Sequence, residues 1–186
     1  MSEPVVRVCG VGEVAADVAL LTDVEAARRQ RLVQQADRDA YLAAHVLVRL
    51  VTAELTGRDP GGLTLVHTCP TCAGTDHGRP AIVEHPEVRV SLSHTRGVVA
   101  AIAASTPCGI DVETIGRIPD PALTPAERAW AGEDATRRTL LWTRKEAWVK
   151  ASGVALDRAA ETDVLHAPWV SGEIVTAGYA ATWVVL

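Results

Sequence analysis

Helical and strand patterns follow one another along this chain in a definite order, and that order limits its possible folds more than any other feature. A cap at Thr22 or Asp23 predicts a polar helix over residues 23–35, and apolar side chains at helical spacing predict a helix over 37–56. Two further helices are expected over 125–131 and about 134–153. Alternating or short continuous apolar runs predict strands over residues 5–9, 63–67, 88–95, 98–105 and 108–113, and a strand-rich tail over 163–186. The helices precede most of the strands in each half. We therefore predict an α+β fold of two similar halves packed face to face, residues 1–105 and 106–186.

The composition is that of an ordinary globular protein, with 48% hydrophobic and 22% charged residues among 186. These fractions argue against a disordered tail, a collagen-like fibre and a coiled coil. A formal net charge of −5 argues against a general binder of nucleic acid or of anionic membranes. Because no apolar run reaches the roughly 18–20 residues of a membrane span and the N-terminus lacks a signal-peptide pattern, we expect a cytoplasmic protein.

Lysine is unusually rare in this chain. Arginine supplies all the positive side-chain charge except that of Lys145 and Lys150. A lysine ammonium is compact and its pKa shifts readily with its surroundings, whereas a guanidinium is broad and always charged. The two lysines are therefore candidates for a specific role.

The segment GIDVE, residues 109–113, places two carboxylates close together. On a strand, Asp111 and Glu113 point to one face, and Ile110 and Val112 point to the other. Two carboxylates on one face form either a solvated surface or, with a cation between them, a site whose hard oxygen ligands suit Mg²⁺. Both interpretations are open at this point.

A helix with the sequence WTRKEAWVKASG, residues 142–153, presents Glu146 and Lys150 one turn apart on the same face. Such a pair is either a surface ion pair or part of a functional cleft. Trp142 and Trp148 favour a helix with one face buried against a sheet. Upstream, Ser93 and His94 stand at a strand end, where the histidine is either structural or a phosphate ligand.

Together these motifs resemble those of the 4'-phosphopantetheinyl transferases, specifically the pseudo-dimeric Sfp type. The resemblance runs from about Leu21 to Ala155 and rests on the following segments in this order: GRP (78–80), SLSHT (91–95), GIDVE (109–113) and WTRKEAWVKASG (142–153). It implies the α+β phosphopantetheinyl transferase fold, with two similar halves arranged as a pseudo-dimer and the metal site in the second half.

The resemblance also implies a reaction, substrates and a cofactor. The 4'-phosphopantetheine group would pass from coenzyme A to a serine of an acyl or peptidyl carrier protein, releasing adenosine 3',5'-bisphosphate. The cofactor would be Mg²⁺, for which Mn²⁺ can substitute. We expect a monomer whose partners are coenzyme A and a carrier protein, with no nucleic acid and no membrane among them.

Residue roles carry over by position. Asp111, Glu113 and Glu146 correspond to the Mg²⁺ ligands, and Glu146 also to the base for the carrier serine, acting directly or through water. Lys150 corresponds to the residue that compensates or protonates the leaving phosphate. The remaining coenzyme A contacts implied by the resemblance are Arg28, Arg79, Ser93, His94 and Lys145.

The sequence departs from the family pattern at three places. Ala40 stands where many relatives carry an arginine, so that one phosphate contact is missing or comes from Arg38. Residues 154–156 read VAL where relatives often have a second glycine, and the chain is short at its C-terminus.

Two other functional classes compete with an active transferase. One is a catalytically silent relative that only binds coenzyme A or a carrier protein. The other is a zinc-dependent interaction module, because Cys69 and Cys72 form a CxxC pair with His67 and His77 nearby. The whole segment 68–82 carries turn residues and is predicted to be a loop.

Overall fold

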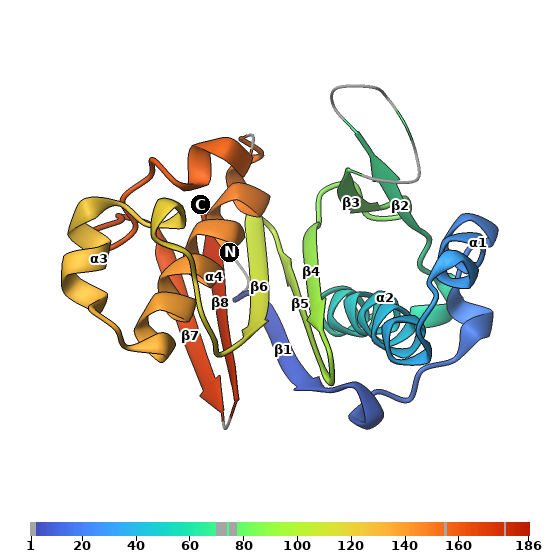
Figure 1. Ribbon diagram of the computed structural model, residues 1–186. Coiled ribbons are helices and arrows are strands. Elements are labelled where there is room, and N and C mark those ends of the chain that lie inside the picture. The colour runs from blue at the N-terminus through green and yellow to red at the C-terminus, as the bar shows by residue number, and fades with distance from the viewer. Residues whose placement is uncertain (1–2, 70–73, 75–77, 155, 177) are drawn as a thin grey trace.

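Two antiparallel sheets lie face to face between outer helices (Figure 1). The computed structural model describes residues 3–69, 74, 78–154, 156–176 and 178–186. The first sheet has the order β1-β5-β4-β3-β2 and the second the order β6-β8-β7. The strands are β1 (Val5–Gly10), β2 (Leu65–Thr68), β3 (Arg79–Ile82), β4 (Arg89–Thr95), β5 (Val98–Ala104), β6 (Cys108–Thr114), β7 (Val170–Thr176) and β8 (Tyr179–Val185).

The helices follow the predicted order. They are α1 (Asp23–Arg31), α2 (Gln35–Thr56), α3 (Pro125–Ala131) and α4 (Ala135–Ser152), with short 3-10 turns between some elements. A Thr22 side chain caps α1 and a Thr124 side chain caps α3, each paired with a glutamate three residues on. Gly57 and Gly153, both with positive φ, end α2 and α4. These local signals explain why the helices were predictable.

The strand β5 shows how the layers are built. Val99, Ala101 and Ala103 pack with α2 in one apolar core, whereas Ala100 and Ile102 face the second sheet in another. Because side chains alternate along a strand, a continuous apolar run such as β5 has to be covered on both faces. The order of layers is therefore α2, first sheet, second sheet, α4 (Figure 1).

The contact between β6 and α4 is especially close. A Cβ atom added at Gly109 would lie 2.0 Å from the carbonyl oxygen of Ala147 on α4, which no side chain tolerates. This glycine brings the next residues of β6 directly against the helix that carries Glu146 and Lys150.

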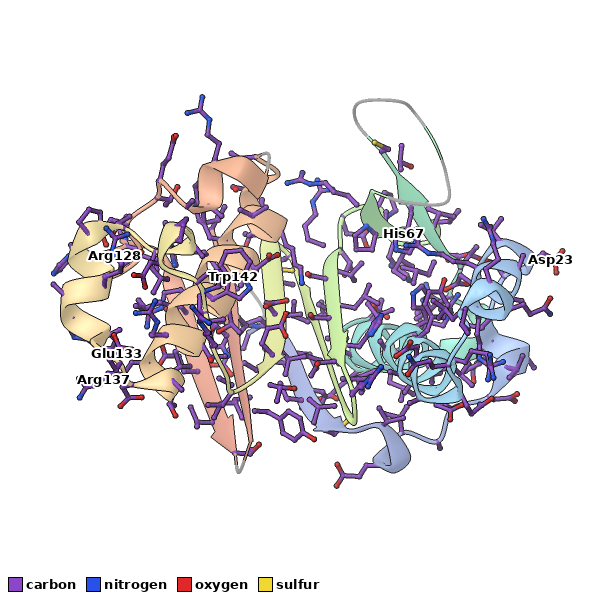
Figure 2. The ribbon with its side chains drawn as sticks, in the orientation of Figure 1. Asp23, His67, Arg128, Glu133, Arg137 and Trp142 are labelled. Atoms are coloured by element: carbon purple, nitrogen blue, oxygen red, sulfur yellow. The ribbon has the colours of Figure 1, made fainter. Side chains whose placement is uncertain are left out.

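Two sequence predictions are corrected here. Residues 79–82 form β3 and not a loop, because the backbone of Ala81 pairs with Arg89 on one side and with Val66 on the other. Pro80 fits since β3 is short and meets β4 through a single registered pair. In the tail, the strand begins only at Val170. Glu133 and Arg137 lie around the corner between α3 and α4 (Figure 2), and both are exposed.

Candidate active site

Asp111 is the centre of the site. It lies on β6, is only 4% exposed, and accepts hydrogen bonds at Oδ1 from Ser93 Oγ and from Lys150 Nζ, each 2.7 Å long. Its other oxygen, Oδ2, is buried without a hydrogen-bond partner. An unpartnered buried carboxylate oxygen is costly, so a group that binds there would be favoured.

Lys150 connects α4 to β6, the strand at one edge of the second sheet. Its ammonium donates to the carbonyl oxygen of Ile110 at 3.0 Å as well as to Asp111. The amide of Ile110 donates to Ser91 Oγ at 3.2 Å. Both backbone groups of this edge residue are therefore bonded by side chains from other elements.

Glu113 and Glu146 belong to the same electrostatic neighbourhood. Burial raises the pKa of both carboxyl groups, and the negative charge of Asp111 raises each pKa further, while Lys150 lowers it. Glu146 is an additional cause of the raised pKa of Glu113. Since like charges repel, Glu113 and Glu146 lie within electrostatic range of Asp111 and Lys150.

The donor set is chemically suited to a divalent cation. Carboxylate oxygens are the protein ligands that Mg²⁺ prefers, and Asp111 Oδ2 is buried and unbonded. Among the described residues, no three carboxylate, imidazole or thiol groups are arranged so that they could hold a metal ion together. Mg²⁺ usually keeps several waters and binds through one or two carboxylates plus substrate phosphates, so an open set of this kind fits it.

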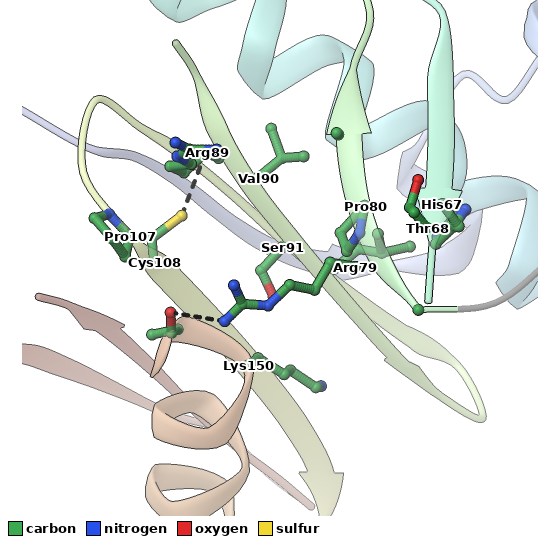
Figure 3. Close-up of a pocket in the computed structure, with 14 residues that line it drawn as sticks. His67, Thr68, Arg79, Pro80, Arg89, Val90, Ser91, Pro107, Cys108 and Lys150 are labelled. Carbon is green, nitrogen blue, oxygen red and sulfur yellow. Dashed lines mark hydrogen bonds between the residues drawn. The ribbon is translucent and has the colours of Figure 1, made fainter. Parts of the chain in front are cut away.

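A pocket of about 590 Å³ opens beside Lys150 (Figure 3). Its cationic walls are Arg79 from β3, Arg89 from β4 and Lys150 from α4. Arg79 reaches across to α4 and donates to the carbonyl oxygen of Ala151 at 3.3 Å. Apolar side chains of Pro80, Val90 and Pro107 line the rest (Figure 3).

A second pocket of about 490 Å³ shares Lys150, His67, Gly78 and Leu92 with the first. Arg28, Ser93 and His94 also line it. Burial lowers the pKa of His67 to about 4, so its ring is neutral at neutral pH. The shared lining residues make the two pockets neighbours on either side of Lys150, and together they contain every predicted coenzyme A contact except Lys145.

Lys145 lies elsewhere. It is 0% exposed, and its ammonium pairs with Glu127 of α3 at 2.9 Å. It also donates to the carbonyl oxygens of Ala159 and Thr162. Every donor of this ammonium is engaged in the core of the second half, so we leave Lys145 out of the phosphate contacts proposed below. In the same way, Arg38 donates to Leu32, Val33 and Gln35 in the turn between α1 and α2, so it does not substitute for an arginine at Ala40.

A buried network near the second pocket was not foreseen. Glu25 accepts from His45 Nδ1 at 2.7 Å and from Arg49, and all three side chains are under 5% exposed. Burial alone would raise the pKa of Glu25, but hydrogen bonds from His45 and Arg49 lower it to about 2. Arg49 is completely buried on α2, whereas its neighbour Leu50 is exposed. The only sequence signal for this network was the capping pair of Thr22 and Glu25, which places Glu25 in the first turn of α1.

The predicted zinc ligands are only partly described. His67 lines both pockets and Cys69 is half-buried, whereas Cys72 and His77 lie outside the described residues. Of the other two cysteines, Cys108 is buried and donates to the Arg89 carbonyl oxygen, and Cys9 is half-buried. Burial raises the pKa of Cys108 to about 12, so it is an inert thiol.

None of the described helices is both long and apolar enough to cross a membrane. Comparison with curated proteins found no match to this chain. A comparison with protein families found a match for residues 107–183, to the model of the 4'-phosphopantetheinyl transferase superfamily. The matched part forms the second sheet and its helices and includes Asp111, Glu113, Glu146 and Lys150.

Proposed function

We propose that this protein transfers the 4'-phosphopantetheine group of coenzyme A to a serine of an acyl or peptidyl carrier protein. One observation carries the proposal: in the family-matching segment Lys150 is bonded to the buried Asp111, within electrostatic range of Glu113 and Glu146, and lines a pocket with cationic walls. Phosphoryl transfer needs positioning and compensation of negative charge more than covalent catalysis, and this site offers both.

In the proposed reaction, the hydroxyl oxygen of the carrier serine attacks the phosphorus atom that bears the pantetheine arm. A bond forms between that oxygen and the phosphorus, and the bond from the phosphorus to the bridging pyrophosphate oxygen breaks. Adenosine 3',5'-bisphosphate leaves with the electron pair. The serine proton passes to Glu146, directly or through a water molecule, because a carboxylate with a raised pKa accepts it more readily.

Asp111, Glu113 and Glu146 are the residues that would hold Mg²⁺, or Mn²⁺ in its place. A bound divalent ion supplies charge compensation to the pyrophosphate. Lys150 stabilises the charge that develops on the leaving phosphate, since its ammonium lies between the carboxylates and both pockets. Arg79, Arg28 and His94 are proposed to contact the nucleotide part of coenzyme A.

We further propose that the protein is of the pseudo-dimeric Sfp type and acts as a monomer in the cytoplasm. Support comes from the layout: each half has one sheet with a long helix on its outer face, α2 in residues 1–105 and α4 in 106–186. The carboxylates belong to the second half, and Arg28, Arg79 and His94 belong to the first. The proposed site therefore uses residues of both halves of the chain.

The proposed activity is tested by the intact mass of a carrier protein after incubation with enzyme, coenzyme A and Mg²⁺. We expect the carrier to gain the mass of one phosphopantetheine group. A carrier with alanine in place of the modified serine should gain nothing, and chelation of the metal should prevent the gain. Tight coenzyme A binding without any mass gain across several carriers would contradict the proposal and indicate a silent binding relative.

Coenzyme A should bind more tightly than dephospho-coenzyme A, and its affinity should fall as salt rises. The reason is that Arg28 and Arg79 are proposed to face anionic groups, whose attraction is screened by salt. Burial lowers the pKa of His94, so this residue would contribute a hydrogen bond and little charge. Calorimetry with both compounds at two salt concentrations measures this directly. Equal affinities would remove the proposed contact with the 3'-phosphate.

A further inference from the structure

The two sheets are joined along β4 and β6 by side chains from successive positions of one face of β4. Ser91 accepts from the Ile110 amide, Ser93 donates to Asp111, and Thr95 lies 3.4 Å from Thr114 through their hydroxyl oxygens. Ser91 and Ser93 share one face of β4 because side chains on one face of a strand recur every second residue. They bond to two consecutive residues of β6, Ile110 and Asp111.

Within this seam, Asp111 is fixed by two donors. Ser93 comes from the first sheet and Lys150 from α4, and both bond to the same oxygen, Oδ1. The backbone of Asp111 is fixed as well, since it pairs with Thr182 of β8. Oδ1 accepts two hydrogen bonds, and Oδ2 is the oxygen of this buried carboxylate that lacks a partner.

The hydroxyl of Ser93 has only one proton to donate. A phosphate oxygen near neutral pH accepts hydrogen bonds, so a contact with phosphate would use that same proton. In the structure the proton is directed to Asp111 at 2.7 Å. The bond to a charged, 4% exposed carboxylate is a strong type of hydrogen bond.

We infer that Ser93 is a positioning residue for Asp111 and does not bind the phosphates of coenzyme A. It holds Oδ1 so that Oδ2 is left to bind the divalent cation. The inference rests on the proposed function for the identity of the cation site, but its test does not require transfer activity. Of the adjacent residues Ser93 and His94, Ser93 would then bond to the Asp111 carboxylate, and only His94 would contact the nucleotide.

The experiment compares the wild type with Ser93→Ala, Ser93→Thr and Thr95→Val. The conservative threonine keeps a hydroxyl at position 93. The Thr95 variant alters the same face of β4, where the side chain touches Thr114 and has no bond to Asp111. Two affinities are measured for each protein. The affinity for Mn²⁺ comes from the concentration of free Mn²⁺ measured by electron paramagnetic resonance, and the affinity for coenzyme A comes from calorimetry in the presence of chelator. Circular dichroism and thermal unfolding establish that each variant is folded.

We expect Ser93→Ala to weaken Mn²⁺ binding by about tenfold or more, as is usual when a partner of a metal ligand is removed. Its metal-free affinity for coenzyme A should stay that of the wild type, and Ser93→Thr and Thr95→Val should bind Mn²⁺ normally.

Unchanged Mn²⁺ affinity with weakened coenzyme A binding would overturn the inference and make Ser93 a phosphate contact. Absence of Mn²⁺ binding by the wild type would also overturn it. A failure of carrier modification alone would contradict the proposed function and leave this result standing. If Ser93→Ala does not fold, Ser93→Cys, whose thiol is a much weaker donor than the hydroxyl, takes its place: weakened Mn²⁺ binding supports the inference, and unaltered Mn²⁺ affinity with weaker coenzyme A binding contradicts it.

Discussion

Replacing Glu146 by glutamine is expected to abolish phosphopantetheine transfer while the protein remains folded. The change keeps the shape of the side chain but removes a metal ligand and the proposed base from one site. Loss of a general base alone lowers a rate by about 10²–10⁴-fold, so the combined loss should exceed about a thousandfold. Stability should be kept, because burial and then the negative charge of Asp111 raise the pKa of this half-buried carboxyl, so its charge is not a stabilising one. The measurement is the rate of carrier modification at saturating coenzyme A and Mg²⁺.

Glu133→Gln is the matched control for this variant. Glu133 is exposed at the corner between α3 and α4 (Figure 2), away from the carboxylate cluster, and its removal changes the net charge by the same amount. It should transfer at the wild-type rate. If Glu146→Gln turns over within about tenfold of wild type, a difference of only ~1.4 kcal/mol in the barrier, the assignment of Glu146 is wrong.

The second large effect concerns stability. Lys145→Met should lower the free energy of unfolding by about 3–5 kcal/mol, because it leaves the buried carboxylate of Glu127 without its cation. The pair lies completely inside the protein, with both side chains 0% exposed and 2.9 Å between Nζ and Oε2. The loss extends to the backbone carbonyls of Ala159 and Thr162, which accept from the same ammonium. Urea unfolding followed by circular dichroism gives the difference.

Lys150→Met is the natural comparison, because it removes the only other lysine from the same helix. Its side chain is 29% exposed and its partner Asp111 belongs to the proposed active site, so we expect a smaller loss of stability and a much larger loss of transfer. Should the Lys145 variant be too unstable to purify, Glu127→Gln tests the same pair, since it removes only the negative charge. Wild-type stability in both Lys145→Met and Glu127→Gln would disprove the structural role, and a specific loss of coenzyme A affinity in Lys145→Met would restore its role as a phosphate contact.

Much of the fold could be predicted because it depends on local physical rules. The predicted bounds of α3 and α4 agree with the structure to within one residue, whereas α1 begins at the predicted Asp23 but ends at Arg31, four residues before the predicted end. Strand alternation likewise predicts that Asp111 and Glu113 share one face of β6, away from the core formed by Ile110 and Val112. These features need only neighbours in the sequence, so the sequence alone was sufficient for them.

The placement of individual polar side chains depended on the tertiary structure. Lys145 and Lys150 are five residues apart on one helix, so their side chains diverge by about 140° around its axis. Sequence spacing shows that they point in different directions, but not which of them meets Asp111 and which meets Glu127. Ser93 shows the same limit, since its acceptor is on a strand of the other sheet. The sequence thus determined the elements and the carboxylate face, and the packing of the sheets and helices decided which cation, hydroxyl and carboxylate came together, because those pairs form between segments that have no local relation to each other.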